Sequence, residues 1–316
     1  MVDCNTPLKY SPRERVMRVI RHAQADCIPV GEIFIDDSVI AGYLDCSQIG
    51  FKERLTFINK MGYDIVCLSP QYHCYGSDLP AAQDLVFPHL ENWLLDTDIF
   101  TFVMLDGIMG WGNKLWGFNN FMPLLYRSPL SFEAFVEQVE KLNLEILDYL
   151  LDVGINGVII ADDLAYQRGL ITSPAVLRKY ILPSLAPQVR KVNSNGTPVF
   201  FHSDGNINEI MDDIVEAGFS GIHYIDHHAG MDILDLQSKY GKQLCLWGTI
   251  DVEDIENVND RKHVQKLQTV ISNFERKGFI LGTSCGLFKG IDFNKLMDLY
   301  ETLLKPPNMK EEYYNK

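Results

Sequence analysis

Long apolar runs and closely spaced pairs of cysteines are both missing from this sequence of 316 residues. No apolar run approaches the roughly 20 residues that span a bilayer, and residues 1–16 lack the apolar core of a secretory signal. The seven cysteines are scattered without a CxxC pair, and their odd number favours reduced thiols, most of them small core residues. We therefore expect a cytoplasmic protein.

Basic residues are scarce relative to acidic ones: the chain has 28 Lys and Arg against 42 Asp and Glu, a formal net charge of −14. A strongly acidic surface attracts neither nucleic-acid phosphates nor anionic lipid headgroups. We expect neither nucleic acid nor a membrane as the main partner. A polyanionic substrate is also disfavoured unless basic residues gather locally.

A glycine-rich phosphate-binding turn is missing after the first predicted strand, where the sequence reads GEIFIDDSV. That absence disfavours an open doubly wound sheet. Eight short apolar runs instead alternate with segments of helical period, which predicts an α/β fold with one closed (β/α)8 TIM barrel. The predicted strands are residues 28–34, 64–69, 100–106, 157–162, 197–203, 221–226, 243–249 and 279–284.

Two helices are well marked around this barrel. Ser11 begins a capping box, SPRE, ahead of an N-terminal helix, and residues 131–154 carry one apolar stripe that ends at a glycine. Long loops follow the second and third strands, at residues 70–99 and 107–129, and the second resembles a pocket wall or lid. We predict a single domain over residues 1–316, with the barrel at about 26–305 and a loosely ordered tail at 306–316.

Polar side chains recur where the predicted strands end, which is where barrel enzymes carry their chemistry. Carboxylates that lie close together are costly unless a cation or a shared proton relieves them. Substrate contacts are predicted for Asp106, Trp111, Tyr166 and His227. The strand-end residues are Glu32, Ser69, Asp106, Asp162, Asp163, His202, Asp204, His227, His228, Asp251 and Cys285.

A metal site is one interpretation of three of these residues. His202 and Asp204 are two apart on an extended strand and point to one face, and Cys285 ends the last strand. Together they offer N, O and S ligands for zinc with one position open. The alternative is that His202 bonds a carbonyl and Cys285 packs as an apolar residue. Glu32 would supply a fourth ligand or cap the next helix.

The pair Asp162-Asp163, in IADDLAYQRG, is a second candidate. One carboxylate would act as an acid or base, or orient a substrate or ligand. In the structural alternative, Asp163 caps the following turn and Asp162 pairs with Arg168. We predict catalytic roles for Asp162, Asp163 and Glu32. The pair His227-His228 fits a loop edge better than a catalytic role, and Asp251 fits a helix N-cap as well as a ligand.

Five segments together resemble one known family. They are SPRERVMRVIRHAQADCIPV, IADDLAYQRGLITSPAVLRKYILP, VFFHSDGNINEIMDDIVEAGFSGI, LWGTIDV and FILGTSCG, in that order over most of the chain. They are similar to the uroporphyrinogen decarboxylase superfamily, which includes the cobalamin-dependent methyltransferases. The resemblance implies a (β/α)8 barrel with its site at the strand C-termini.

Two departures favour the methyltransferase branch within this resemblance. True decarboxylases carry an arginine-bearing segment after the first strand, whereas residues 30–43 contain acids and no arginine. They also have histidine where Cys285 stands. The methylcobamide:coenzyme M-like methyltransferases hold zinc with a His-x-Cys pair and a distant Cys, which His202 and Cys285 match. Asp204 stands in place of the middle cysteine, and its carboxylate is a competent zinc ligand.

We therefore predict a zinc-dependent methyltransferase that activates a thiol or a methyl donor at a His/Asp/Cys site. The resemblance implies methylcobalamin carried by a partner corrinoid protein, with a homodimer as one option for assembly. The first alternative is a metal-free decarboxylase that uses an active-site aspartate as proton donor. The second is a non-catalytic binding protein of the corrinoid pathway.

Overall fold

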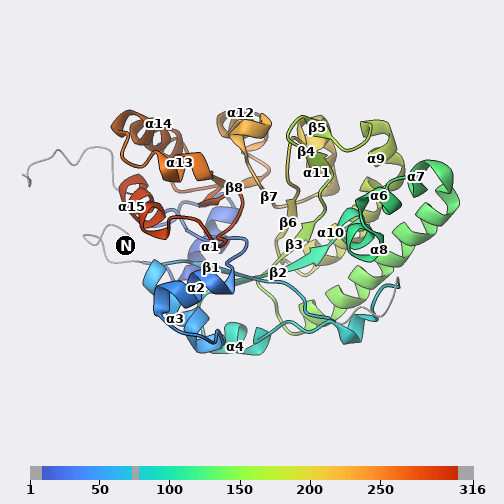
Figure 1. Ribbon diagram of the computed structural model, residues 1–316, viewed down its shortest axis with the longest axis horizontal. Coiled ribbons are helices and arrows are strands. Elements are labelled where there is room, and N and C mark those ends of the chain that lie inside the picture. Colours follow the sequence, from blue (N-terminus) through green and yellow to red (C-terminus); the bar gives the residue numbers. More distant parts are fainter. Residues whose placement is uncertain (1–8, 73–77, 305–316) are drawn as a thin grey trace, which may run out of the picture.

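A parallel sheet of seven strands forms the centre of the molecule in the computed structural model, which describes residues 9–72 and 78–304. The sheet curls into a half-barrel surrounded by helices (Figure 1). This is an α/β fold of TIM-barrel type. In spatial order the strands are β1 (Ile65–Leu68), β2 (Phe100–Asp106), β3 (Gly157–Ala161), β6 (Val199–His202), β7 (Gly221–His223), β8 (Cys245–Ile250) and β9 (Phe279–Thr283).

The predicted strand at residues 28–34 is wrong as a strand. Only isolated bridges form there: Val30 pairs with Leu281 of β9 in parallel. On the opposite side the carbonyl of Val30 accepts the N–H of Asp64, the residue before β1, at 2.7 Å. This short segment therefore lies between the two ends of the seven-stranded sheet and is hydrogen-bonded to both.

Side chains occupy the positions that a continuous eighth strand would need. In a regular parallel ladder with β9, the carbonyl of Gly31 would accept the N–H of Thr283. Instead Trp247 Nε1 donates to Gly31 O at 3.0 Å, and the N–H of Thr283 donates to Glu32 Oε2 at 3.0 Å. Both partners are more than 200 residues distant in the chain, so a local pattern does not report them.

The inside of the curled sheet is filled with large apolar side chains. The rings of Phe102 and Phe200 pack edge to face with their centroids 5.3 Å apart, and the centroid of the Trp247 ring lies 5.5 Å from that of Phe102. Helix α1 (Pro12–Ile20) adds Val16, Val19 and Ile20 to the same cluster. The capping box predicted at Ser11 is confirmed. The core therefore closes the end of the barrel that lies opposite the carboxyl ends of the strands.

The remaining helices surround the sheet and pack through a second apolar cluster. The longest, α8 (Pro129–Asp152), runs along the right side of Figure 1 and confirms the helix predicted at residues 131–154. No helix in the described ranges has the length and apolarity to cross a bilayer. The others are α2 (Asp37–Leu44), α3 (Phe51–Met61), α9 (Pro174–Tyr180), α10 (Leu182–Ser194), α11 (Met211–Ala217), α12 (Ile233–Tyr240), α13 (Val252–Glu256), α14 (Arg261–Ser272) and α15 (Phe293–Leu303).

Both long connections predicted from the sequence carry helices of their own. The first holds α4 (Leu90–Leu95), and the second holds α5 (Ile108–Trp116), α6 (Phe118–Phe121) and α7 (Leu124–Arg127). Three short 3-10 helices, η1 (Ala82–Asp84), η2 (Asn208–Ile210) and η3 (His227–Ala229), and a hairpin of β4 (Ala165–Tyr166) with β5 (Gly169–Leu170) complete the description. The tail predicted at 306–316 lies outside the described residues.

Candidate active site and metal centre

Strand register aligns one row of residues across the carboxyl edge of the sheet. Asp106 of β2 pairs with Ala161 of β3, which pairs with His202 of β6. His202 in turn pairs with His223 of β7, and His223 pairs with Trp247 of β8. Since these strands are parallel, paired side chains point the same way. The register therefore sets two histidines side by side above the aromatic core.

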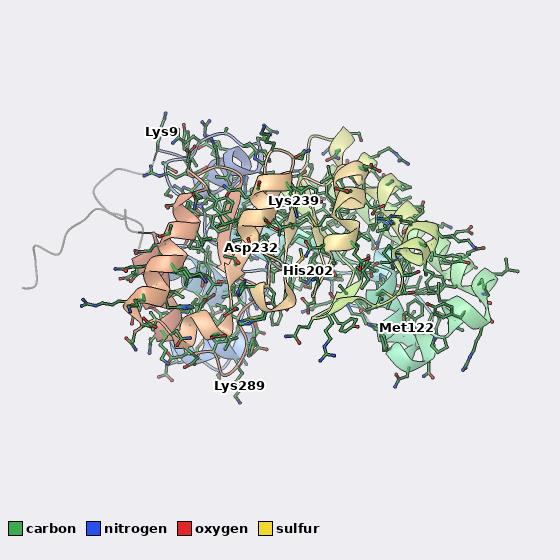
Figure 2. The ribbon with its side chains drawn as sticks, turned by 90° about the horizontal axis from the view of Figure 1, so that it is seen from above. Lys9, Met122, His202, Asp232, Lys239 and Lys289 are labelled. Carbon is green, nitrogen blue, oxygen red and sulfur yellow. The ribbon has the colours of Figure 1, made fainter. Side chains whose placement is uncertain are left out.

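Three polar side chains meet at this edge. Asp163, His202 and Asp204 each offer one ligand atom, and these atoms all lie within 4.8 Å of one another. Nε2 of His202 is 3.7 Å from Oδ1 of Asp204. Figure 2 shows His202 near the middle of the molecule when it is seen from above. The geometry is that of a small N,O,O donor set on adjoining strand ends.

The turn that follows β6 is held in one conformation by hydrogen bonds to the segment that follows β3. The N–H of Asp204 donates to Oδ1 of Asp163 at 3.1 Å, and the N–H of Asn206 donates to the carbonyl of Tyr166 at 3.0 Å. Between them, Gly205 has φ +83°, and a Cβ there would lie 2.5 Å from the backbone nitrogen of Tyr166. Only glycine fits this contact, so the turn fixes where the Asp204 carboxylate lies.

Negative charge at this group is uncompensated. Burial, followed by the nearby charges of Asp163 and Asp226, raises the pKa of Asp204 to about 6. In the described part of the chain, no Lys or Arg forms an ion pair with Asp163 or Asp204. A bound cation would relieve this repulsion. Burial lowers the pKa of His202, opposed by Asp163, so its ring is neutral and suited to metal ligation at neutral pH.

A second histidine, which the sequence did not single out, completes the site. Nδ1 of His223 lies 2.9 Å from Nδ1 of His202, and His223 is fully buried. Burial, followed by the proximity of His202, holds the pKa of His223 well below its usual range. The local sequence, GIHYID, reads as an ordinary buried strand. The signal that would have identified His223 was its register with His202, which depends on strand pairing.

Asp162 has a different environment from Asp163, which follows it in the chain. Asp162 is fully buried, and its Oδ1 accepts the N–H groups of Met109 and Gly110 at 2.6 and 3.3 Å, at the start of α5. Its other oxygen, Oδ2, is buried without a hydrogen-bond partner. Burial outweighs these hydrogen bonds and raises the pKa of Asp162 to about 7. Asp162 therefore caps α5, and no ion pair joins it to Arg168 among the described residues.

Glu32 lies below the rim and is saturated with donors. Its Oε2 accepts Thr283 Oγ1 at 2.6 Å, and its Oε1 accepts the hydroxyls of Tyr300 and Tyr63 at 2.6 and 3.5 Å. Burial raises the pKa of Glu32 to about 7 despite these donors. Glu32 caps no helix, because Asp36 is the N-cap of α2.

Cys285 is exposed and stands apart from the donor set formed by His202, Asp204 and Asp163. Its Sγ donates to the carbonyl of Gly286 at 3.4 Å. Burial of the sulfur, followed by the charge of Glu32, raises the pKa of the thiol to about 11. At neutral pH the thiol is therefore protonated.

The residues predicted to contact substrate differ in their exposure and in their partners. Asp106 pairs with Lys114 of α5 at 2.5 Å. Trp111 is buried, with its Nε1 unpartnered, whereas Tyr166 and His227 are exposed. Beside His227, His228 bridges Asp251 and Glu253 at 3.1 and 3.0 Å, and Asp251 is the N-cap of α13.

The comparisons with known proteins identify the family of this chain. A family model described as uroporphyrinogen decarboxylase (URO-D) matches residues 104–305, which is more than half of the chain. The chain belongs to the uroporphyrinogen decarboxylase family. The matched range contains the last residues of β2 and all of β3 to β9, and therefore all three residues of the N,O,O donor set. The family resemblance predicted from the five sequence segments is confirmed.

Solved structures share the fold at low sequence identity. A methyltransferase from Methanosarcina mazei has a TM-score of 0.70 and 12% identity, covering 93% of this chain and 98% of that one. A broad-specificity GH5-4 endoglucanase from Clostridium longisporum has a TM-score of 0.50 and 13% identity, covering 93% and 97%. No curated protein sequence matches. The fold shared with these structures therefore extends over most of the chain.

Proposed function

We propose that this protein is a metal-dependent methyltransferase that transfers a methyl group between a corrinoid, carried by a partner protein, and a small thiol or other heteroatom substrate. The observation that carries the proposal is the donor set of Asp163, His202 and Asp204 at the carboxyl edge of the sheet. Family membership and the likeness to a protein described as a methyltransferase support the reaction class.

The donor set suits zinc. Imidazole and carboxylate are both established zinc ligands, and catalytic zinc sites use three protein ligands with one position open. His202, Asp204 and Asp163 are the proposed ligands, and Cys285, predicted from the sequence, is the competing third ligand. Bound zinc would supply Lewis-acid chemistry, lowering the pKa of a substrate thiol at the open position.

The protein's own groups then have distinct tasks. Asp163 and Asp204 would hold the metal through their carboxylates, and both are exposed, so the proton that the thiol loses passes to solvent. Asp162 fixes the first turn of α5 through its Oδ1. That helix belongs to the 107–127 connection, to which we assign the exclusion of water from the reacting atoms.

Metal analysis and a methyl-transfer assay test this function together. Protein purified after zinc-replete expression is expected to retain about one zinc per chain, and to consume free methylcobalamin in the presence of a small thiol, followed by absorbance. His202→Ala is expected to lose both properties. Protein without zinc, whose His202→Ala variant is also unchanged in methylcobalamin consumption, would contradict the proposal.

A decarboxylase is the second candidate, favoured by one observation. Asp162 is buried, has one unpartnered oxygen, and has a pKa raised to about 7, so it is suited to donate a proton at neutral pH. Against it, the acids at this edge would repel a carboxylated substrate. Turnover of a carboxylated substrate that survives a chelator but not Asp162→Asn would favour this candidate. A binding protein without catalysis would show neither activity.

A further inference from the structure

The contact between His202 and His223 restricts how their protons are arranged. Nδ1 of one ring lies 2.9 Å from Nδ1 of the other, so one of these nitrogens donates and the other accepts, because two N–H groups at this distance would repel. A neutral imidazole has one N–H and one lone pair. Only two arrangements make a hydrogen bond here: His202 donates to His223, or His223 donates to His202.

The far side of each ring decides between them. Nε2 of His202 faces Asp204 and the metal-ligand cluster. A metal held by this cluster needs the Nε2 lone pair of His202, which leaves the proton of His202 on Nδ1. Nδ1 of His223 is then the acceptor. His223 therefore carries its proton on Nε2, which is buried without a hydrogen-bond partner.

We propose that His223 is a positioning residue: its Nδ1 lone pair accepts the Nδ1–H of His202 and so leaves the Nε2 lone pair of His202 directed at Asp163 and Asp204. This inference rests on the proposed metal-binding function. A histidine that ligates a metal through one nitrogen commonly donates its other N–H to an acceptor, which fixes both the tautomer and the ring orientation. Here the acceptor is a second histidine.

The surroundings hold His223 in this role. The His223 ring packs edge to face against the Trp247 ring, with the ring centroids 5.1 Å apart and the ring planes at 83°. Strand register fixes His223 beside His202. Aromatic packing and strand pairing therefore fix where the Nδ1 atom of His223 lies.

The first test reads the tautomers directly in the zinc-loaded protein. In zinc-saturated protein labelled with 15N-histidine, long-range 15N–1H spectra at pH 7.5 should show His202 with Nδ1 protonated and His223 with Nε2 protonated. Signals are assigned by their loss in His202→Gln and His223→Gln. A His223 protonated on Nδ1 in the zinc-loaded protein would overturn the proposal.

The second test measures zinc affinity by chelator competition. His223→Leu removes the acceptor and is expected to weaken binding about 10- to 100-fold. His223→Gln keeps an acceptor oxygen and is expected to stay within about threefold of wild type. His89→Gln, an exposed histidine outside the site, controls for loss of any histidine. Unchanged affinity in a folded His223→Leu, or equal loss in Leu and Gln variants, would overturn the proposal. Absence of zinc binding in wild type would contradict the proposed function and, with it, this inference, whereas wild-type zinc affinity in His223→Leu would contradict this inference alone.

Discussion

Two groups of ionisable side chains at the same edge of the sheet differ in how their charges are satisfied. Glu32 is 1% exposed, and both its oxygens accept hydrogen bonds from Tyr63, Thr283 and Tyr300. Asp163 and Asp204 are exposed and have no Lys or Arg partner among the described residues. A saturated carboxylate has no lone pair to spare for a ligand, whereas an unsaturated pair does.

This difference separates a structural acid from candidate ligands. The donors around Glu32 come from segments far apart in the chain, from Tyr63 before β1 to Tyr300 on α15. They join residues 30–32 to the end of the sheet where an eighth strand would otherwise stand. We therefore assign Glu32 to holding the sheet together, and the group of Asp163, His202 and Asp204 to binding.

The largest expected effect is the loss of stability on removing the Glu32 carboxylate. Glu32→Ala leaves two tyrosine hydroxyls and the Thr283 donors buried without an acceptor, and each unsatisfied group costs about 1–3 kcal/mol. We expect the free energy of unfolding to fall by at least about 3 kcal/mol, measured by urea denaturation. Asp163→Ala, on the exposed side of the comparison, should change it by less than about 1 kcal/mol. Equal losses of unfolding free energy in the two variants would show that Glu32 and Asp163 do not differ in their structural role.

Removal of the His202 ring should weaken zinc binding and leave the protein folded, the reverse of the effect expected at Glu32. His202→Ala is expected to weaken zinc binding by at least about 100-fold, equivalent to roughly 2.7 kcal/mol, while the protein remains folded. The reason is that one of three proposed ligands is lost at a site where the others carry like charge. Chelator competition measures the affinity and circular dichroism checks the fold. His89→Gln is the control. A His202→Ala protein with wild-type zinc affinity would exclude this histidine as a ligand.

The pH dependence of stability should report Glu32. Its pKa is about 7 in the folded protein and about 4.3 when unfolded, so the folded state binds more protons between these values. Its contribution is therefore fully present below about pH 4 and is lost as pH rises through 7. Between pH 5.5 and 8 we expect wild type to lose about 2 kcal/mol more than Glu32→Gln. Subtracting the variant is necessary because the pKa values of Asp162 and Asp204 are raised in the same direction. Parallel curves would contradict the assignment.

Much of the fold was predictable because its signals are local. The strand predicted at 100–106 coincides with β2, and the capping box at Ser11 begins α1 as expected. The strand predicted at residues 28–34 was wrong because this segment is hydrogen-bonded by the side chain of Trp247 and the backbone of Thr283. These contacts form only when distant parts of the chain come together. A short apolar run predicts burial, but it does not predict which groups complete its hydrogen bonds.

The site was predictable only in part, for a related reason. His202 and Asp204 are two residues apart, so the period of an extended strand was enough to place them together. His223 required knowledge that β6 pairs with β7 in the register that aligns it with His202. The approach of Asp163 required the turn after β6 to fold back to it. Pairing and loop contact are tertiary properties that neither spacing nor residue type encodes.

The smallest expected effect distinguishes the third zinc ligand. The structure groups Asp163 with His202 and Asp204 and leaves Cys285 outside that group, whereas the sequence predicted Cys285 as the ligand. We expect Asp163→Asn to weaken zinc binding about tenfold or more, and Cys285→Ser to remain within about threefold of wild type. Asparagine keeps the size of the side chain and serine keeps a small polar group, so each variant tests the ligand atom with little change in packing. The reverse order of affinities would mean that zinc draws Cys285 into the site and that Asp163 serves to hold the turn at Asp204.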